Sequence, residues 1–210
     1  MNINISSDIK SAQKKLSRVQ NKQIPFAASL AINETAENAN NAVKAQARKK
    51  LDNPRPQTVN AFRVGKRAIK SRLRCDVFIL DWADEFLRYQ IEGGVRRSGG
   101  AGTGVPVNQR LNKYGNIPGR RKGLVKKANQ FIATIKGITG VWERGHYTKS
   151  GKFSGGKKSA GTAVKLVVAF ETSVKYKARL PYYKIVNSVV ASKFNRNFSF
   201  ALRRALATAR

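Results

Sequence analysis

Residues 24–51 read IPFAASLAINETAENANNAVKAQARKKL, and this stretch predicts a long helix from Pro25 to about Leu51. Proline suits the first turn of a helix, where its missing N–H would have had no partner. One apolar stripe steps along the helix by three or four residues: Ala28, Ile32, Ala36, Ala39, Val43, Ala47 and Leu51. Because most of this stripe is alanine, another element can approach closely, so we expect a partner helix or sheet in this chain or in another subunit.

Short helices are expected on both sides of this stretch. Polar side chains at residues 6–8 offer N-cap oxygens for a helix over Ser7 to about Gln20, and a polar break at 21–23 separates it from the long helix. After the long helix, two prolines within residues 52–56 prevent its continuation. Asp81 then caps a short helix that runs to about Ile91 and is closed by two glycines.

The chain ends in a basic amphipathic helix. Pro181 opens the final helical region, in which Ala191–Ala209 has the clearest helical pattern. Its expected apolar face comprises Phe194, Phe198, Ala201 or Leu202, Ala205 and Thr208.

Strand patterns occupy the middle of the chain. The clearest is TAVKLVVAFE at Thr162–Glu171, which is rich in β-branched residues. Three further strands are expected at Thr58–Lys66, Cys75–Leu80 and Gly140–Arg144. Two segments leave alternatives open: Leu124–Ile135 fits a short helix or a strand, and Ser173–Leu180 either extends the clearest strand or pairs with it.

This order of elements predicts an α+β fold, in which the long N-terminal helix and the C-terminal helix pack on a small, mostly antiparallel sheet. We treat residues 1–210 as a single domain with an N-terminal helical segment at 1–51. Residues 93–123 and 148–161 are rich in glycine and basic residues and have no apolar periodicity. We expect them to be flexible basic loops that become ordered on contact with a partner.

Positive charge dominates the composition. The chain has 42 Lys+Arg against 11 Asp+Glu, a net charge of +31, and residues 93–210 hold 25 basic but only two acidic residues. Such a surplus favours a negatively charged partner, and DNA, RNA and an acidic protein surface all qualify. The candidate contacts lie in or beside the glycine-rich segments: Arg96, Arg97, Arg120, Arg121, Lys122, Lys126, Lys127, Lys157 and Lys158. The same residues also fit solvated loops that dock on acidic neighbours.

No group of residues points to catalysis, a cofactor or a metal. Cys75 is the single cysteine and fits a small buried side chain, while His146 stands alone. The acidic cluster Asp81, Asp84 and Glu85 has the spacing of a helix start. Residues 151–158 resemble a phosphate-binding loop, but Lys158 replaces the required Ser/Thr and a strand follows instead of a helix. We therefore expect a non-enzymatic protein.

Membrane and secretion signals are not expected either. No apolar run approaches the length of a membrane-spanning helix, and MNINISSDIK has no hydrophobic stretch of the signal-peptide type. The sequence thus predicts synthesis in the cytoplasm.

Several short stretches resemble the minor tail protein Z type of tailed bacteriophages. IPFAASLAINETA at 24–36 resembles the opening of its long alanine-rich helix, and NPRPQTVNAFRV at 53–64 resembles the following proline-rich turn and strand. FLRYQIEGGVRR at 86–97, NKYGNIP at 112–118 and VWER at 141–144 resemble three further signatures, in the same order along the chain. They span about the first two-thirds of the sequence.

The resemblance implies a virion component that acts in tail completion or head–tail joining, as part of an oligomeric ring or collar. Its implied partners are other virion proteins, namely portal, adaptor or tail-tube subunits, together with further copies of itself and packaged DNA. It implies no catalytic residue. The alternative from charge alone is a general nucleic-acid-binding protein that contacts the phosphate backbone without sequence specificity.

Overall fold

The computed structural model describes residue 17 and residues 19–99, 102–117, 127–155 and 163–208. These residues form helices and antiparallel strands, so the α+β prediction is confirmed. Contacts group them into two compact units, one made of residues up to Ile91 together with those from Arg179, and one of Glu92–Ala178. We call them the helical unit and the strand unit and describe each by itself.

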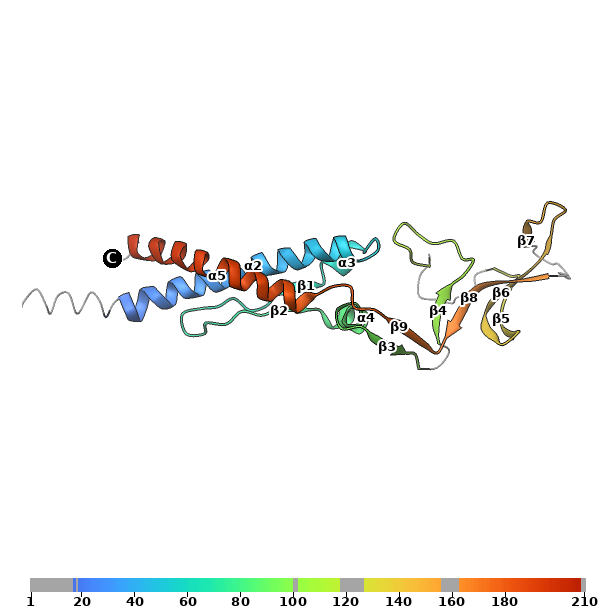
Figure 1. Ribbon diagram of the computed structural model, residues 1–210, viewed down its shortest axis with the longest axis horizontal. Helices are drawn as coiled ribbons and strands as arrows, with labels where there is room; N and C mark the ends of the chain where they lie inside the picture. The colour runs from blue at the N-terminus through green and yellow to red at the C-terminus, as the bar shows by residue number, and fades with distance from the viewer. Residues whose placement is uncertain (1–16, 18, 100–101, 118–126, 156–162, 209–210) are drawn as a thin grey trace, which may run out of the picture. The chain divides into compact units, whose positions relative to one another are not determined.

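Two long helices dominate the helical unit and lie side by side (Figure 1). They are α2 (Ile24–Lys50) and α5 (Tyr182–Ala207). A single π-helical turn, η1 (Val19–Gln23), leads directly into α2, and Gln23 has helical angles of φ −82° and ψ −39°. The expected polar break at 21–23 is therefore wrong, because the backbone stays helical through it. Most of the helix expected at Ser7–Gln20 lies outside the described residues.

Alanine forms the contact between α2 and α5. Ala27 and Ala31 of α2 meet Ala201 and Ala205 of α5, and all four are at most 5% exposed. The C-terminal face was predicted correctly from Phe194 to Ala205, with Phe194, Phe198 and Leu202 packed around the contact, but wrongly at Thr208, which is exposed. On α2 the predicted stripe is correct from Ala36 to Ala47 but wrong at its start, where Ala28 and Ile32 are only half-buried. There α5 covers the neighbouring face of the helix.

A larger core lies at the other end of α2. It is built with β1 (Phe62–Val64), β2 (Val77–Ile79), α4 (Asp81–Ile91) and the start of α5. The short helix α3 (Pro56–Val59) precedes β1 in the chain. Strands β1 and β2 pair antiparallel, and buried Phe62 stacks on Tyr182 with ring centroids 6.1 Å apart. The helix expected at 81–91 is confirmed. The strand expected at 58–66 is shorter, because Pro56 begins a helical turn that continues to Val59.

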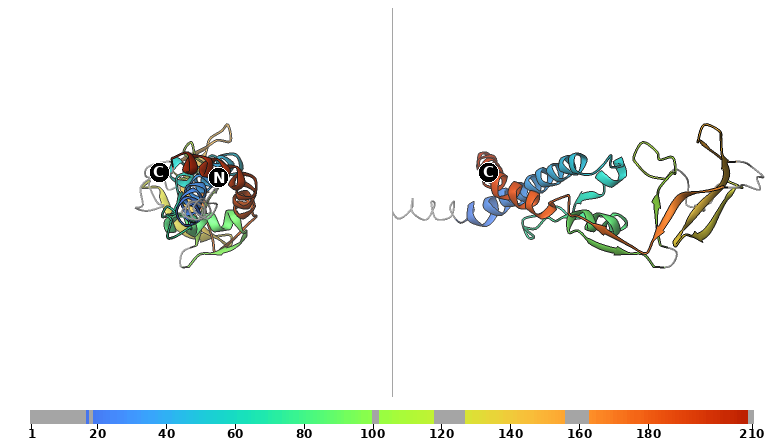
Figure 2. Two further views of the ribbon diagram at one scale, coloured as in Figure 1. Left: turned by 90° about the vertical axis from the view of Figure 1, so that its left-hand side faces the viewer. Right: turned by 45° about the vertical axis from the view of Figure 1, so that its right-hand side comes forward.

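Antiparallel pairing builds all of the strand unit (Figure 2). Strand β3 (Gly94–Arg97) pairs with β9 (Ser173–Tyr176) in a two-stranded sheet. A five-stranded sheet has the order β4–β8–β6–β5, with β7 also paired to β6. Its strands are β4 (Thr103–Pro106), β5 (Gln130–Ile135), β6 (Ile138–Tyr147), β7 (Phe153–Gly155) and β8 (Ala163–Glu171).

Some expected loops contain short strands. Strands β3 and β4 fall within 93–123, and β7 falls within 148–161, so the prediction of loops without regular structure is wrong at these residues. Each of these strands has only three or four residues, too few for a periodic pattern. The open segment 124–135 forms strand β5 over its second half. Lys136 and Gly137 join β5 to β6 in a two-residue turn, with φ values of 53° and 77°.

Candidate interaction surfaces

The predicted cationic contacts are spread over two sheets. Arg96 and Arg97 lie on β3, where they pair in register with Val174 and Ser173 of β9. Lys127 lies just before β5 of the five-stranded sheet, so the structure does not bring it together with the two arginines in one sheet. The remaining predicted contacts lie outside the described residues: Arg120, Arg121, Lys122, Lys126, Lys157 and Lys158.

Lys127 takes part in a polar cluster around Glu143. Its Nζ lies 3.2 Å from Glu143 Oε1, and the Asn129 side-chain amide donates to the same oxygen at 3.1 Å. Partial burial raises the pKa of the Glu143 carboxyl, but the hydrogen bonds from Asn129 and Lys127 outweigh it and bring the pKa below its ordinary value. Glu143 is therefore ionised at neutral pH and holds the segment before β5 against β6.

Two further cations of this sheet lie over aromatic rings. The Arg144 guanidinium carbon is 4.4 Å from the centre of the Phe131 ring, and Lys165 Nζ is 5.7 Å from the centre of the Phe153 ring. Such contacts contribute about 0.5–1 kcal/mol at exposed sites and leave the charge available to solvent. Sequence reasoning did not identify Arg144 or Lys165, because the contacts depend on strand register: Phe131 is opposite Trp142, two residues before Arg144 on β6.

The strand unit has a small core and an exposed edge. Among its described residues, the buried cluster consists of Val141, Val167 and Val168, with Ile117 and Phe170 packed against it. Strand β5 is the last strand of the sheet order, carries no charged residue and exposes Ile132 to 59%. An uncharged edge strand presents unpaired N–H and C=O groups to which another chain can bind.

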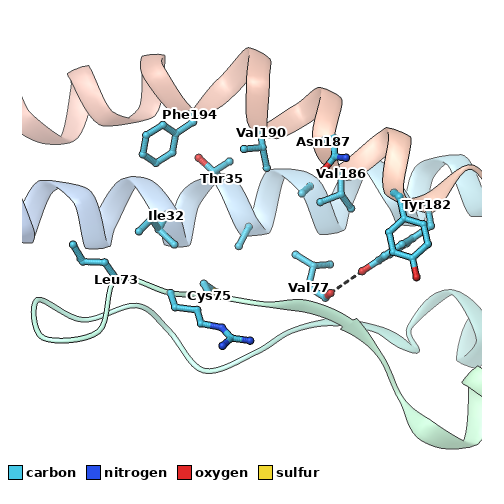
Figure 3. Close-up of a pocket in the computed structure, with 14 residues that line it drawn as sticks. Ile32, Thr35, Leu73, Cys75, Val77, Tyr182, Val186, Asn187, Val190 and Phe194 are labelled. Carbon is cyan, nitrogen blue, oxygen red and sulfur yellow. Dashed lines mark hydrogen bonds between the residues drawn. The ribbon is translucent and has the colours of Figure 1, made fainter.

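An apolar hollow of about 510 Å³ lies in the helical unit between α2, α5 and the segment leading into β2. Figure 3 shows Ile32 and Thr35 on one wall, Val186, Val190 and Phe194 on a second, and Cys75 with Leu73 on the third. Asn33 fixes the segment by bonding both the N–H and the C=O of Ala68, at 2.7 and 3.0 Å. Cys75 is half-buried, and desolvation raises the pKa of its thiol. This thiol is protonated at neutral pH and is a poor nucleophile.

A second groove, of about 580 Å³, runs between α2 and the C-terminal half of α5. Lys193, Arg196, Phe200 and Arg204 of α5 line one side, and Leu30 and Glu34 of α2 line the other. Phe200 is 70% exposed, the largest exposed fraction among the large apolar side chains described. Sequence reasoning missed this groove, although these α5 residues recur every three or four positions and share one face of the predicted helix.

Within the described part of the chain, no three His, Cys, Asp or Glu side chains gather as metal ligands would, and no helix is long and apolar enough to cross a membrane. Asp81 and Asp84 lie in the first turn of α4, as predicted. Comparisons with protein-family models, curated proteins and solved structures found no match for this chain.

Proposed function

We propose that this protein is a structural component of a tailed-bacteriophage virion, acting in tail completion or head–tail joining as part of an oligomeric ring or collar. One observation carries the proposal: the strand unit has only a small buried valine cluster, and its edge strand β5 is exposed and uncharged. A sheet with so little buried apolar area gains stability when further chains cover it. In an assembled ring or collar, neighbouring subunits would cover the sheet.

The composition supports the same proposal. Large apolar side chains that a monomer would bury are exposed in both units, including Trp82, Ile132, Tyr147 and Phe200. Exposed aromatic residues are enriched at protein interfaces. The phage assignment itself rests on the ordered short stretches, from IPFAASLAINETA at 24–36 to VWER at 141–144.

In this proposal the cationic residues act by docking on acidic neighbours, such as portal, adaptor or tail-tube subunits. Arg97 is exposed on β3, and Arg144 is exposed on β6. Each remains available to a carboxylate on an adjacent subunit, with which arginine forms bidentate pairs. The expected location is the assembled particle.

Negative-stain microscopy of the purified protein, alone and mixed with portal or tail subunits, tests the proposal. We expect rings or collars of uniform diameter. A protein that stays monomeric under both conditions, and does not bind any of these subunits, contradicts the assembly role.

A second candidate function is non-specific binding of nucleic acid, and the charge of residues 93–210 favours it. The logarithm of the duplex affinity would then fall linearly with the logarithm of the salt concentration, with a slope of about −0.9 for each phosphate contact. Fluorescence anisotropy with random-sequence duplexes of equal length measures this slope. The absence of duplex binding at low salt would eliminate this candidate and leave the assembly proposal intact.

A further inference from the structure

We propose that the groove between α2 and α5 binds the acidic face of helix α4 from a second copy of this chain. This inference rests on the proposed assembly function and names one interface by which the copies join. The groove presents Lys193, Arg196 and Arg204 around the exposed ring of Phe200. Helix α4 presents the opposite charge around an exposed aromatic ring of its own.

The acidic face of α4 lies opposite the side of the helix that is buried in the core. Ala83 and Leu87 are buried, so Asp81 and Glu85 lie on the opposite side of the helix, with Asp84 beside them. Trp82 borders this face and is 50% exposed. Three of the chain's 11 acidic residues thus fall within five positions, in a protein with a net charge of +31. Arg88 follows Asp84 by four residues and Glu85 by three, so it shares this face and reduces its net charge to −2; its guanidinium carbon lies 5.1 Å from the centre of the Tyr89 ring.

Within the described helical unit, neither the groove cations nor the α4 carboxylates form a close ion pair. Ion pairs there join Arg74 to Asp76 and Arg179 to Asp52, and neither includes a groove cation or an α4 carboxylate. Glu34 lies in the groove wall, where its carboxylate accepts a hydrogen bond from Asn38 at 3.5 Å. The apolar floor of Leu30 and Ala201 disfavours a phosphate backbone. An acidic helix with an aromatic side chain matches this floor and the three cations around it, although the Glu34 carboxylate opposes either anion.

The two surfaces cannot meet within one copy. Ala83 and Leu87 of α4 belong to the same buried cluster as Tyr182, the first residue of α5. The centre of the groove, at Phe200, lies 18 residues further along α5, about 27 Å at the rise of an α-helix. The contact must therefore be between copies. Because donor and acceptor surfaces differ, the contact repeats head to tail, and such a contact closes into a ring when its rotation allows.

Aromatic and arginine side chains dominate the binding energy of many interfaces. Here Phe200 and Trp82 supply the aromatic groups, while Arg196 and Arg204 supply charge that selects the partner face. Like charges elsewhere in the chain repel, which limits the number of competing arrangements.

Charge reversal on each side, followed by mixing, tests the inference with the full chain. One variant is R196E/R204E and the other is D81K/E85K. K184E/R203E is the control for the first, since both residues are exposed on α5 outside the groove. E37K/E92K is the control for the second, since it reverses two other exposed carboxylates. Sedimentation velocity at about 0.05 M and about 0.5 M salt gives the assembly state, because screening differs strongly between the two.

We expect wild type and both controls to assemble in low salt, and each groove or α4 variant to weaken assembly at least about tenfold in dissociation constant. An equimolar mixture of the two variants restores assembly, because each then offers the charge that the other needs; a misfolded variant would not be rescued. High salt weakens wild-type assembly and the rescued mixture alike.

Assembly that survives either charge reversal, or variants that mixing does not rescue, overturns the inference and leaves the proposed function standing. Groove reversal that abolishes duplex binding while assembly persists overturns it in favour of nucleic acid. Wild type that is monomeric at about 100 µM in low salt overturns this interface. Absence of the protein from purified virions contradicts the proposed function instead.

Discussion

Replacing the buried alanines at the contact between α2 and α5 by a larger residue is expected to destabilise the helical unit. Ala205 is fully buried and Ala31 is 1% exposed, and both belong to the cluster that joins the two helices. Replacing either by leucine adds three carbon atoms at a contact that has no room for them. The helices must then separate or the new side chain must leave its preferred rotamer, which costs about 1–3 kcal/mol.

Urea denaturation followed by circular dichroism at a fixed salt concentration measures the effect. With a urea m-value of about 2 kcal/mol/M, the expected loss lowers the midpoint by about 0.5–1.5 M for Ala205→Leu. Ala191→Leu is the matched control, because Ala191 is exposed on the same helix and an exposed substitution changes stability by about 0.5 kcal/mol or less. The Ala31→Leu/Ala205→Leu double variant should depart from additivity, since the two residues share one contact.

The reasoning is refuted if Ala205→Leu unfolds at the same urea concentration as Ala191→Leu. That result would mean that the two helices do not approach closely through their small residues. A thermal shift in the same direction, measured by differential scanning calorimetry, provides an independent check.

Three further predictions concern single residues. Tyr182→Phe removes the 2.7 Å hydrogen bond from the Tyr182 hydroxyl to the Val77 carbonyl and should cost about 0.5–1.5 kcal/mol by urea denaturation; an unchanged midpoint would show that this bond contributes nothing. Gly145→Ala places a Cβ 2.6 Å from the Phe153 ring and should destabilise the sheet, seen as faster amide exchange in β6 and β7 than in wild type. Glu143→Gln should lower stability at pH 7, and the difference from wild type should shrink as the pH falls below 4.5, because a lowered folded-state pKa stabilises only while the carboxylate is charged. A difference that is constant with pH would contradict the last prediction.

Elements with a long, local pattern were predictable from sequence. Helix α4 has its predicted bounds, and α2 and α5 follow their stripes of alanine and phenylalanine, because each helix needs only neighbours three or four residues away. The exact face of α2 was not predictable at its start. Ala27 and Ala31 are buried because α5 crosses α2 at these residues. The crossing point depends on contacts between residues about 170 positions apart in sequence.

The short strands, and the contacts that depend on them, could not be predicted from the sequence for the same reason. Strand β3 exists through pairing with β9 nearly 80 residues later, and its own sequence, GVRR, has no strand pattern. The contact of Arg144 with Phe131 likewise depends on the register of β5 and β6. The groove cations could have been found, because Lys193, Arg196, Phe200 and Arg204 already share one face of a correctly predicted helix.

The direct measurement of the central claim is quantitative mass spectrometry of purified phage particles from a host that carries the gene for this chain. The account predicts its peptides at a fixed number of copies per particle, as expected of a ring or collar subunit. Particles that are intact and infectious but contain no trace of the protein would contradict it.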